Sequence, residues 1–246
     1  MSTKTDGKFV VSLEELLEAG CHFGHQARRW HPKMGEYIWN ERDGVHIIDL
    51  EKTQKQLALA CEKVLELTQQ GKILVMVGTK RQASTVIEEE ALRAGIPYVS
   101  KRWLGGTITN WKQLKRSIDR LKDLESKKTT GDLDHYTKKE RVLFDKEIFH
   151  LKREIGGLRN IETAPDALFV VDVKREEAAV REAKKMGVPV IAIIDSNCDP
   201  RMADVAVPAN DDALRSIQLI TKKIADAVIE GKSKKQEAMN NEPKTT

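Results

Sequence analysis

Short runs of consecutive apolar residues recur along two parts of the chain. They lie at residues 73–77, 97–99, 167–171, 188–194 and 205–207. Continuous apolar runs are typical of strands whose two faces are both covered. Stretches with helical spacing of apolar residues separate these runs. This alternation predicts an α/β fold: a five-stranded parallel sheet with helices on both faces.

Two longer helical patterns interrupt the alternation between residues 101 and 157. Apolar residues in the first step by three, four and three, at Trp111, Leu114, Ile118 and Leu121. The second carries the same kind of pattern at Phe144, Ile148, Leu151, Ile155 and Leu158, and a polar stretch separates the two. Heptad-like spacing on two adjacent segments predicts an inserted antiparallel α-helical coiled-coil hairpin.

The pattern therefore predicts a discontinuous organisation. Residues 1–100 and 158–231 form the α/β core, residues 101–157 form the hairpin, and residues 232–246 form a loose polar tail. Within the core, residues 21–44 are expected to be mostly irregular, with a short strand at 37–39 and another at 45–48. The last helix is expected to end at Glu230.

Positive charge is concentrated although the net charge is small. The 246 residues carry a formal net charge of only +4. Residues 101–154 contain 15 Lys and Arg against 9 Asp and Glu, and residues 19–35 contain Arg28, Arg29 and Lys33 but no acid. Clustered cations are typical of a surface that binds nucleic acid, although a solvated face is the alternative.

Cysteine usage and hydropathy bound the cellular setting. The three cysteines, Cys21, Cys61 and Cys198, are widely spaced, so no disulfide framework is predicted. The first eight residues are polar and no window reaches the roughly 18 apolar residues of a membrane span. We expect a cytoplasmic protein without a membrane partner.

Three motifs invite an enzymatic or metal-binding interpretation. The turn Val77-Gly78-Thr79-Lys80-Arg81 follows a strand, but it lacks the glycine spacing of a dinucleotide site and the ending of a phosphate loop. The turn Asp195–Pro200 contains Cys198, but no histidine follows His150, which favours an Asx-type turn over a nucleophile.

Metal ligands of the zinc type are also scattered near the N-terminus. They are Cys21, His22, His25, His31 and His46. No CxxC pair accompanies them, so packing is the better interpretation. We expect His22 and His25 to form hydrogen bonds or stack in an RNA contact. No cofactor is predicted.

The segment from Arg102 to Trp111 combines two tryptophans with a glycine pair, Gly105 and Gly106. Glycines allow backbone to come close to a phosphate, and aromatic rings stack on bases or anchor loops. For Trp30 and Trp103, anchoring in the core is the favoured role.

These segments together resemble the bacterial small-subunit ribosomal protein S-two family. The resemblance is carried, in order, by Phe23–Gln26, Arg29-Trp30, Pro32–Met34, Val45–Leu50 with Lys52-Thr53, Val77–Lys80, Arg102–Gly106 with Thr109-Asn110, Pro165–Val170, Gly187–Ile193 and Asn210–Ala213. It covers about residues 9 to 230. Ala27-Arg28 and Thr107-Ile108 depart mildly from the family pattern.

The resemblance implies a flavodoxin-like fold and a structural constituent of the small ribosomal subunit. It implies binding of small-subunit ribosomal RNA, a role late in assembly, neighbouring ribosomal proteins, possible docking of ribosomal protein S-one, and no enzymatic activity or small-molecule substrate. The alternative is a flavodoxin-like nucleotide-binding enzyme. The predicted RNA contacts are Arg28, Arg29, Lys33, Lys80, Arg81, Lys101, Arg102, Lys112, Lys115 and Arg116.

Overall fold

A five-stranded parallel sheet organises the core, with strand order β5-β4-β6-β7-β8. The computed structural model describes the backbone of residues 9–241 and the side chains of residues 9–238. The strands are β4 (Leu74–Val77), β5 (Tyr98–Val99), β6 (Ala167–Val171), β7 (Val190–Ile194) and β8 (Val205–Pro208). Strand β5 lies at the edge of the sheet beside β4, and β6, β7 and β8 follow in turn on the other side of β4. This is the flavodoxin-like strand order. The predicted parallel sheet is confirmed.

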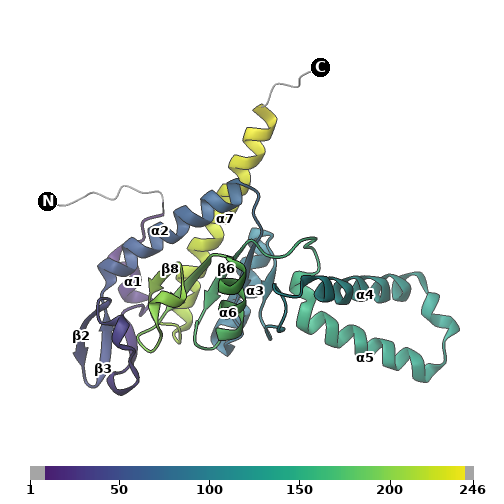
Figure 1. The fold of residues 1–246 in the computed structure, drawn as a ribbon, viewed down its shortest axis with the longest axis horizontal. Coiled ribbons are helices and arrows are strands. Elements are labelled where there is room, and N and C mark those ends of the chain that lie inside the picture. The colour runs from purple at the N-terminus through teal and green to yellow at the C-terminus, as the bar shows by residue number, and fades with distance from the viewer. Residues whose placement is uncertain (1–8, 242–246) are drawn as a thin grey trace.

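Alternate residues of each central strand enter two separate cores. Met76, Phe169 and Ile191 point into one, and Val75, Leu168 and Val190 point into the other. The first is covered by α2 (Leu50–Gln69), α3 (Arg81–Ala94) and α7 (Leu214–Asn241), and the second by α6 (Glu177–Met186). Burial on both faces explains why these strands are continuous apolar runs (Figure 1).

The N-terminal part forms a small lobe with its own antiparallel sheet. It contains α1 (Leu13–Glu18), β1 (Phe23–Gln26), β2 (Ile38–Arg42) and β3 (Val45–Ile48), in the order β1-β3-β2. The two predicted short strands are present, but the expectation of irregular chain before them was wrong. Strand β1 has no alternating apolar residues and is nowhere fully buried, so hydrophobic patterning does not reveal it.

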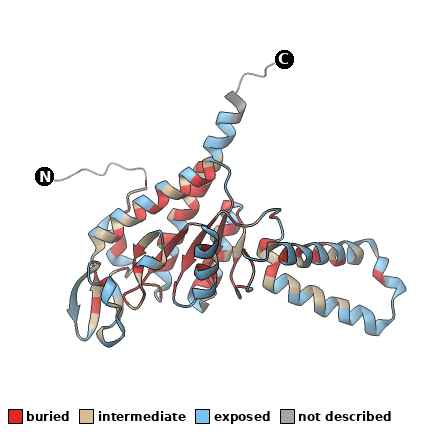
Figure 2. Ribbon diagram, viewed as in Figure 1, coloured by how far each residue is buried: buried red, intermediate tan, exposed pale blue. Residues whose placement is uncertain are grey.

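Two helices extend away from the sheet between β5 and β6. They are α4 (Trp111–Thr130) and α5 (Lys138–Ile155), which lie side by side in Figure 1. Leu114, Ile118, Leu121 and Leu124 are buried on α4, whereas Ile155 is the one fully buried residue of α5. Figure 2 shows this asymmetry as a helix with buried turns beside a helix that is mostly half-buried or exposed.

The C-terminal helix is longer than the sequence pattern indicates. Helix α7 continues to Asn241, so the expectation of an end at Glu230 and a loose tail from Lys232 was wrong for residues 232–241. Lys232 Nζ donates to the carbonyl oxygens of Ala94 and Gly95, at 2.9 and 2.7 Å, which ties this part of the helix to the end of α3. Residues 1–8 and 242–246, including the predicted polar N-terminus, lie outside the described residues.

Gly231 tests how tightly α7 packs on α2. A Cβ at this position would lie 2.9 Å from the carbonyl oxygen of Leu65 and would clash with Thr68 Oγ1. Alanine normally stabilises a helix by about 1 kcal/mol relative to glycine. We expect Gly231→Ala instead to destabilise the protein by about 1–3 kcal/mol, because the added methyl overpacks the contact.

The measurement is denaturant unfolding. The matched control is Ser233→Ala, at an exposed position about half a helical turn further along α7. It should change the unfolding free energy by less than about 0.5 kcal/mol. A stabilising effect of Gly231→Ala would contradict the close approach of the two helices.

Candidate nucleic-acid interface

Charged side chains converge where the parallel strands end. Lys80 follows β4, Asp172 follows β6, and Asp211 and Asp212 follow β8. The Lys80 ammonium lies 3.3 Å from Asp172 Oδ2, 2.7 Å from Asp211 Oδ1 and 2.6 Å from Asp212 Oδ1. Carboxyl ends of parallel strands meet at one edge of the sheet, which is why residues this distant in sequence pair.

Burial sets the electrostatics of this cluster. Burial, followed by the charges of Asp195 and Asp172, raises the pKa of Asp211 to about 7, while Lys80 opposes the rise. Burial by itself disfavours the charge on Lys80, but Asp211, Asp212 and Asp172 outweigh it and raise the pKa of the ammonium. The carboxylates therefore keep Lys80 charged, whereas Lys80 only partly offsets the burial and the neighbouring acids that favour the neutral form of Asp211.

The same cluster fastens the N-terminal lobe to the sheet. His25 Nδ1 lies 3.0 Å from Asp195 Oδ1, and the His25 backbone N–H donates to Ser196 Oγ at 2.8 Å. The His31 backbone N–H donates to the Ser196 carbonyl oxygen at 2.8 Å. The hydrogen bond to Asp195 raises the pKa of His25 against the effect of burial. Both ring nitrogens of His25 face carboxylates within the protein, which disfavours the expected contact of this residue with RNA.

Two overlapping groups among the described residues have ligand atoms close enough to hold a metal ion. One is His25, Asp195 and Asp211, and the other is Asp172, Cys198 and Asp211. Of the five metal-ligand candidates predicted from sequence, His25 alone belongs to such a group. Burial raises the pKa of the Cys198 thiol to about 12, so the free thiol stays protonated at neutral pH, which disfavours a role as a nucleophile.

The strand-end edge is unsuited to a nucleotide phosphate. The backbone N–H of Thr79, at the start of α3, donates to Glu176 Oε1 at 2.7 Å, and the Thr79 hydroxyl donates to the same oxygen at 2.6 Å. A carboxylate thus occupies the donors that a phosphate would use, and the acidic groups around Lys80 would repel one. The geometry argues against the nucleotide-binding alternative.

A single carboxylate anchors the segment between β5 and α4. Glu182, on α6, accepts hydrogen bonds from Trp103 Nε1 at 3.2 Å and from the backbone N–H groups of Gly106 and Ile108 at 2.7 and 3.1 Å. Thr109 donates its backbone N–H and its hydroxyl to the same carboxylate. Trp103 is 7% exposed. The anchoring role favoured for this tryptophan is therefore confirmed.

Glycine is required at one point of this anchored segment. Gly106 has φ +91°, and a Cβ there would lie 3.1 Å from Asn110 Cβ. A side chain would be strained in this left-handed conformation. The glycine lets the backbone turn so that the N–H groups of Gly106, Ile108 and Thr109 face Glu182.

Eight of the ten predicted RNA contacts project from the surface. None of the eight forms an ion pair within the described part of the chain, and all are exposed. They are Arg28, Arg29, Lys33, Arg81, Lys101, Arg102, Lys112 and Arg116. Three of them donate hydrogen bonds to neutral side chains: Lys101 to Ser84 Oγ at 3.2 Å, Arg28 to Gln26 Oε1 at 3.0 Å and Arg116 to Gln113 Oε1 at 3.5 Å.

The other two predicted contacts are occupied within the protein. The Lys80 side chain is 12% exposed and faces three carboxylates. Lys115 forms an ion pair with Glu162 and lies 3.5 Å from Asp119. Their charges are neutralised internally, which disfavours the predicted phosphate contacts.

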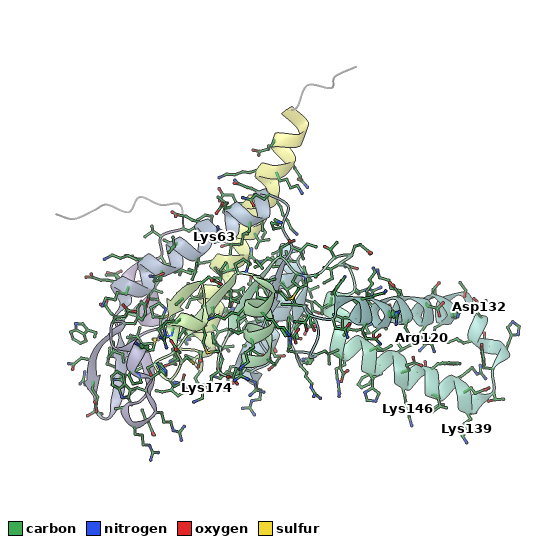
Figure 3. All side chains as sticks on the ribbon, in the orientation of Figure 1. Lys63, Arg120, Asp132, Lys139, Lys146 and Lys174 are labelled. Carbon is green, nitrogen blue, oxygen red and sulfur yellow. The ribbon has the colours of Figure 1, made fainter. Side chains whose placement is uncertain are left out.

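The sequence argument missed two cations and the anchoring carboxylate. Lys174 and Arg175 are exposed directly after β6, at the same edge of the sheet. A cationic pair that follows an apolar strand was the available signal. Figure 3 shows Lys174 on the side of the sheet opposite to Lys63 of α2. Glu182 carried no such signal, because it lies in an ordinary amphipathic helix.

Comparison with known proteins identifies the fold and its setting. The family described as "Ribosomal protein S2" matches residues 16–231. The chain belongs to the ribosomal protein S2 family. "Small ribosomal subunit protein uS2c" of Rhodomonas salina is 51% identical over 226 residues, which cover 92% of this chain and 93% of that protein. "Small ribosomal subunit protein uS2" of Coprothermobacter proteolyticus is 50% identical over 233 residues, covering 95% and 87%.

Membership of the ribosomal protein S2 family fixes the broad role. The chain is a structural protein of the small ribosomal subunit, works in translation and is not an enzyme. Its place is the ribosome in the cytoplasm, as the resemblance implies. Among the described residues, no helix has the length and apolar character needed to cross a membrane.

The Glu182 anchor gives a pH-dependent prediction. Burial alone would raise the pKa of Glu182, but the hydrogen bonds from Gly106, Ile108, Trp103 and Thr109 outweigh it and lower the pKa. A lowered folded-state pKa stabilises the protein above the unfolded value, about 4.3, and this stability is lost as the pH falls through the folded value. At pH 7 we expect Glu182→Gln to cost about 1.5–3 kcal/mol.

Denaturant unfolding at pH 7 and near pH 3 measures this effect. The difference in unfolding free energy between wild type and Glu182→Gln should narrow as the pH falls, because protonation removes the charge that the hydrogen-bond donors stabilise. Glu177→Gln, on the same helix but in an exposed pair with Arg181, should cost less than about 1 kcal/mol. Equal losses of unfolding free energy in Glu177→Gln and Glu182→Gln would contradict the anchoring role of Glu182.

Lys80 should behave as a structural residue. Lys80→Met leaves buried carboxylates without their cation, so we expect a loss of about 3–5 kcal/mol in unfolding free energy. Lys101→Met, the exposed control, should change stability by less than about 0.5 kcal/mol. A Lys80→Met protein of wild-type stability would refute the internal role and restore Lys80 as a candidate for RNA contact.

Proposed function

We propose that the chain binds small-subunit ribosomal RNA through the carboxyl-end edge, defined here as the exposed cations that follow the parallel strands or lie on the lobe docked there. The main support is that eight of the predicted cations are exposed and form no ion pair in the described part of the chain. The nearby carboxylates of Asp172, Asp211 and Asp212 are already paired with Lys80. Unpaired cations gain most from phosphates, because no intramolecular ion pair must first be broken.

Topology supports this gathering of cations. Arg81 follows β4, and Lys101 and Arg102 follow β5, so these three lie at one edge. Arg28 and Arg29 lie in a short 3-10 helix of the lobe, which is held at the same edge by the contacts of His25 and His31 with Ser196. Segments far apart in sequence thus supply one continuous cationic surface.

The two helices α4 and α5 are proposed to act as an inserted coiled-coil hairpin. Residues 101–157 would form this unit, and residues 1–100 and 158–231 would form the discontinuous core. Leu114, Ile118 and Leu121 supply buried seam positions, and Ile148 and Leu151 of α5 pack against them as half-buried residues. Lys112 and Arg116, in the first turns of α4, would extend the RNA contact from the edge onto the hairpin.

Protein partners form the second part of the proposal. We infer that the chain joins the subunit late in assembly and helps dock ribosomal protein S-one, as the family resemblance implies. An apolar groove of about 560 Å³ supports a protein partner on the lobe. Leu13, Leu17 and Trp39 line it, and Trp39 is 72% exposed. Exposed large apolar residues of this kind mark protein contacts.

Salt dependence tests the RNA contact. If about five phosphates are neutralised, the slope of log affinity against log salt should be near −4. The triple variant Arg28→Ala, Arg29→Ala, Arg102→Ala should weaken binding to small-subunit ribosomal RNA and make the slope shallower by about 2–3. Filter binding or fluorescence anisotropy over a salt series measures both.

The control removes three cations elsewhere. Lys55→Ala, Lys63→Ala, Lys185→Ala lowers the net charge equally but affects α2 and α6. It should leave the slope within about 1 of wild type. Equal effects of the two triple variants would show that binding follows net charge alone and would refute the carboxyl-end edge as the interface.

A further inference from the structure

Helix α5 carries a second stripe on the face turned away from α4. The stripe consists of Lys139, Val142, Leu143, Lys146, Phe149 and Arg153, all exposed. Steps of three, four and seven place them on one side of a helix. Figure 3 shows Lys139 and Lys146 projecting away from α4, whereas Arg120 lies between the helices.

Three of the four acidic residues of α5 are engaged away from this stripe. Asp145 pairs with Lys128 at 2.6 Å, and Glu147 pairs with Arg120 at 2.9 Å. Glu140 closes the capping box at the start of the helix. Lys139 and Lys146 have no ion pair within the described part of the chain, and Arg153 has only the adjacent Glu154, at 3.8 Å. The stripe therefore presents net positive charge.

Large apolar side chains separate these cations. Leu143 is 56% exposed and Phe149 is 63% exposed. Lys139, Lys146 and Arg153 recur every seven residues, about 10.5 Å apart along the helix axis. In a seam that accepts another helix, a cation at one heptad position is followed by an apolar residue three or four positions later.

We propose that the outward stripe of α5 docks an amphipathic helix that carries acidic residues at seven-residue spacing with apolar residues between them. The inference rests on the chain's place in the small ribosomal subunit, whose proteins would supply the helix. Charge complementarity selects an acidic partner, because the stripe contains no acid of its own. The apolar residues select a protein, because a phosphate backbone leaves leucine and phenylalanine side chains uncovered, whereas a helix buries them.

Photo-crosslinking in assembled small subunits tests the inference. Phe149 is replaced by benzoylphenylalanine in the full chain, and the products are identified by mass spectrometry. We expect crosslinks to a protein segment with the stated acidic and apolar spacing. Adding Lys139→Glu and Lys146→Glu should lower the crosslink yield at least about fivefold, because both ion pairs become repulsive. Lys55→Glu with Lys185→Glu, the matched charge change elsewhere, should leave it within about twofold.

A direct binding measurement accompanies the crosslinking. The probe is a synthetic helical peptide with glutamate at every seventh position and leucine three and four residues later. Its affinity for the full chain should fall at least about tenfold with Lys139→Glu, Lys146→Glu, and also with Leu143→Ser, Phe149→Ser. Crosslinks to RNA, an absence of crosslinks, or equal peptide affinity in all variants would each overturn the proposal.

Incorporation into subunits is measured separately for each variant. Failure of the wild-type chain to enter the subunit would contradict the ribosomal role itself. A chain that enters normally while the stripe variants change nothing contradicts only the docking surface. The two failures are therefore distinguishable.

Discussion

The structure depends on a buried positive charge held among carboxylates. Lys80 follows one strand, and the acids that neutralise it follow two others, so the cluster joins the ends of β4, β6 and β8. Asp195, after β7, extends it to His25 and thereby to the N-terminal lobe. Neither the cation nor the acids could be buried alone at reasonable cost. The edge of the sheet and the lobe are therefore stabilised as one unit.

This internal neutralisation determines which cations remain available for the proposed RNA contact. Lys80 and Lys115 are used within the fold, and eight other predicted cations are left exposed. Glu182 plays the corresponding role at the start of α4, because one carboxylate accepts hydrogen bonds from five donors in the segment before that helix. On α5 likewise, Asp145 and Glu147 pair with cations of α4, and Lys139 and Lys146 are left exposed.

Hydrophobic patterning predicted the sheet, its covering helices and the two helices between β5 and β6. These features follow from local periodicity, which the sequence displays directly. Strand β1 and the extension of α7 were not predicted, because each is stabilised by contacts distant in sequence rather than by an apolar pattern. Lys232 shows this: its polar side chain suggests a tail, yet it caps the end of α3. The same limit explains Lys80, whose partners lie roughly 90 to 130 residues away, and Glu182, whose donors lie about 75 residues away.

The most direct test of the account is a structure of the small ribosomal subunit assembled with this chain. We predict that phosphate oxygens lie within about 4 Å of at least five of the eight unpaired cations at the carboxyl-end edge and the start of α4, while Lys80 remains paired with its carboxylates. A subunit in which this edge faces solvent or protein, with no phosphate near Arg28, Arg29 or Arg102, would contradict the account.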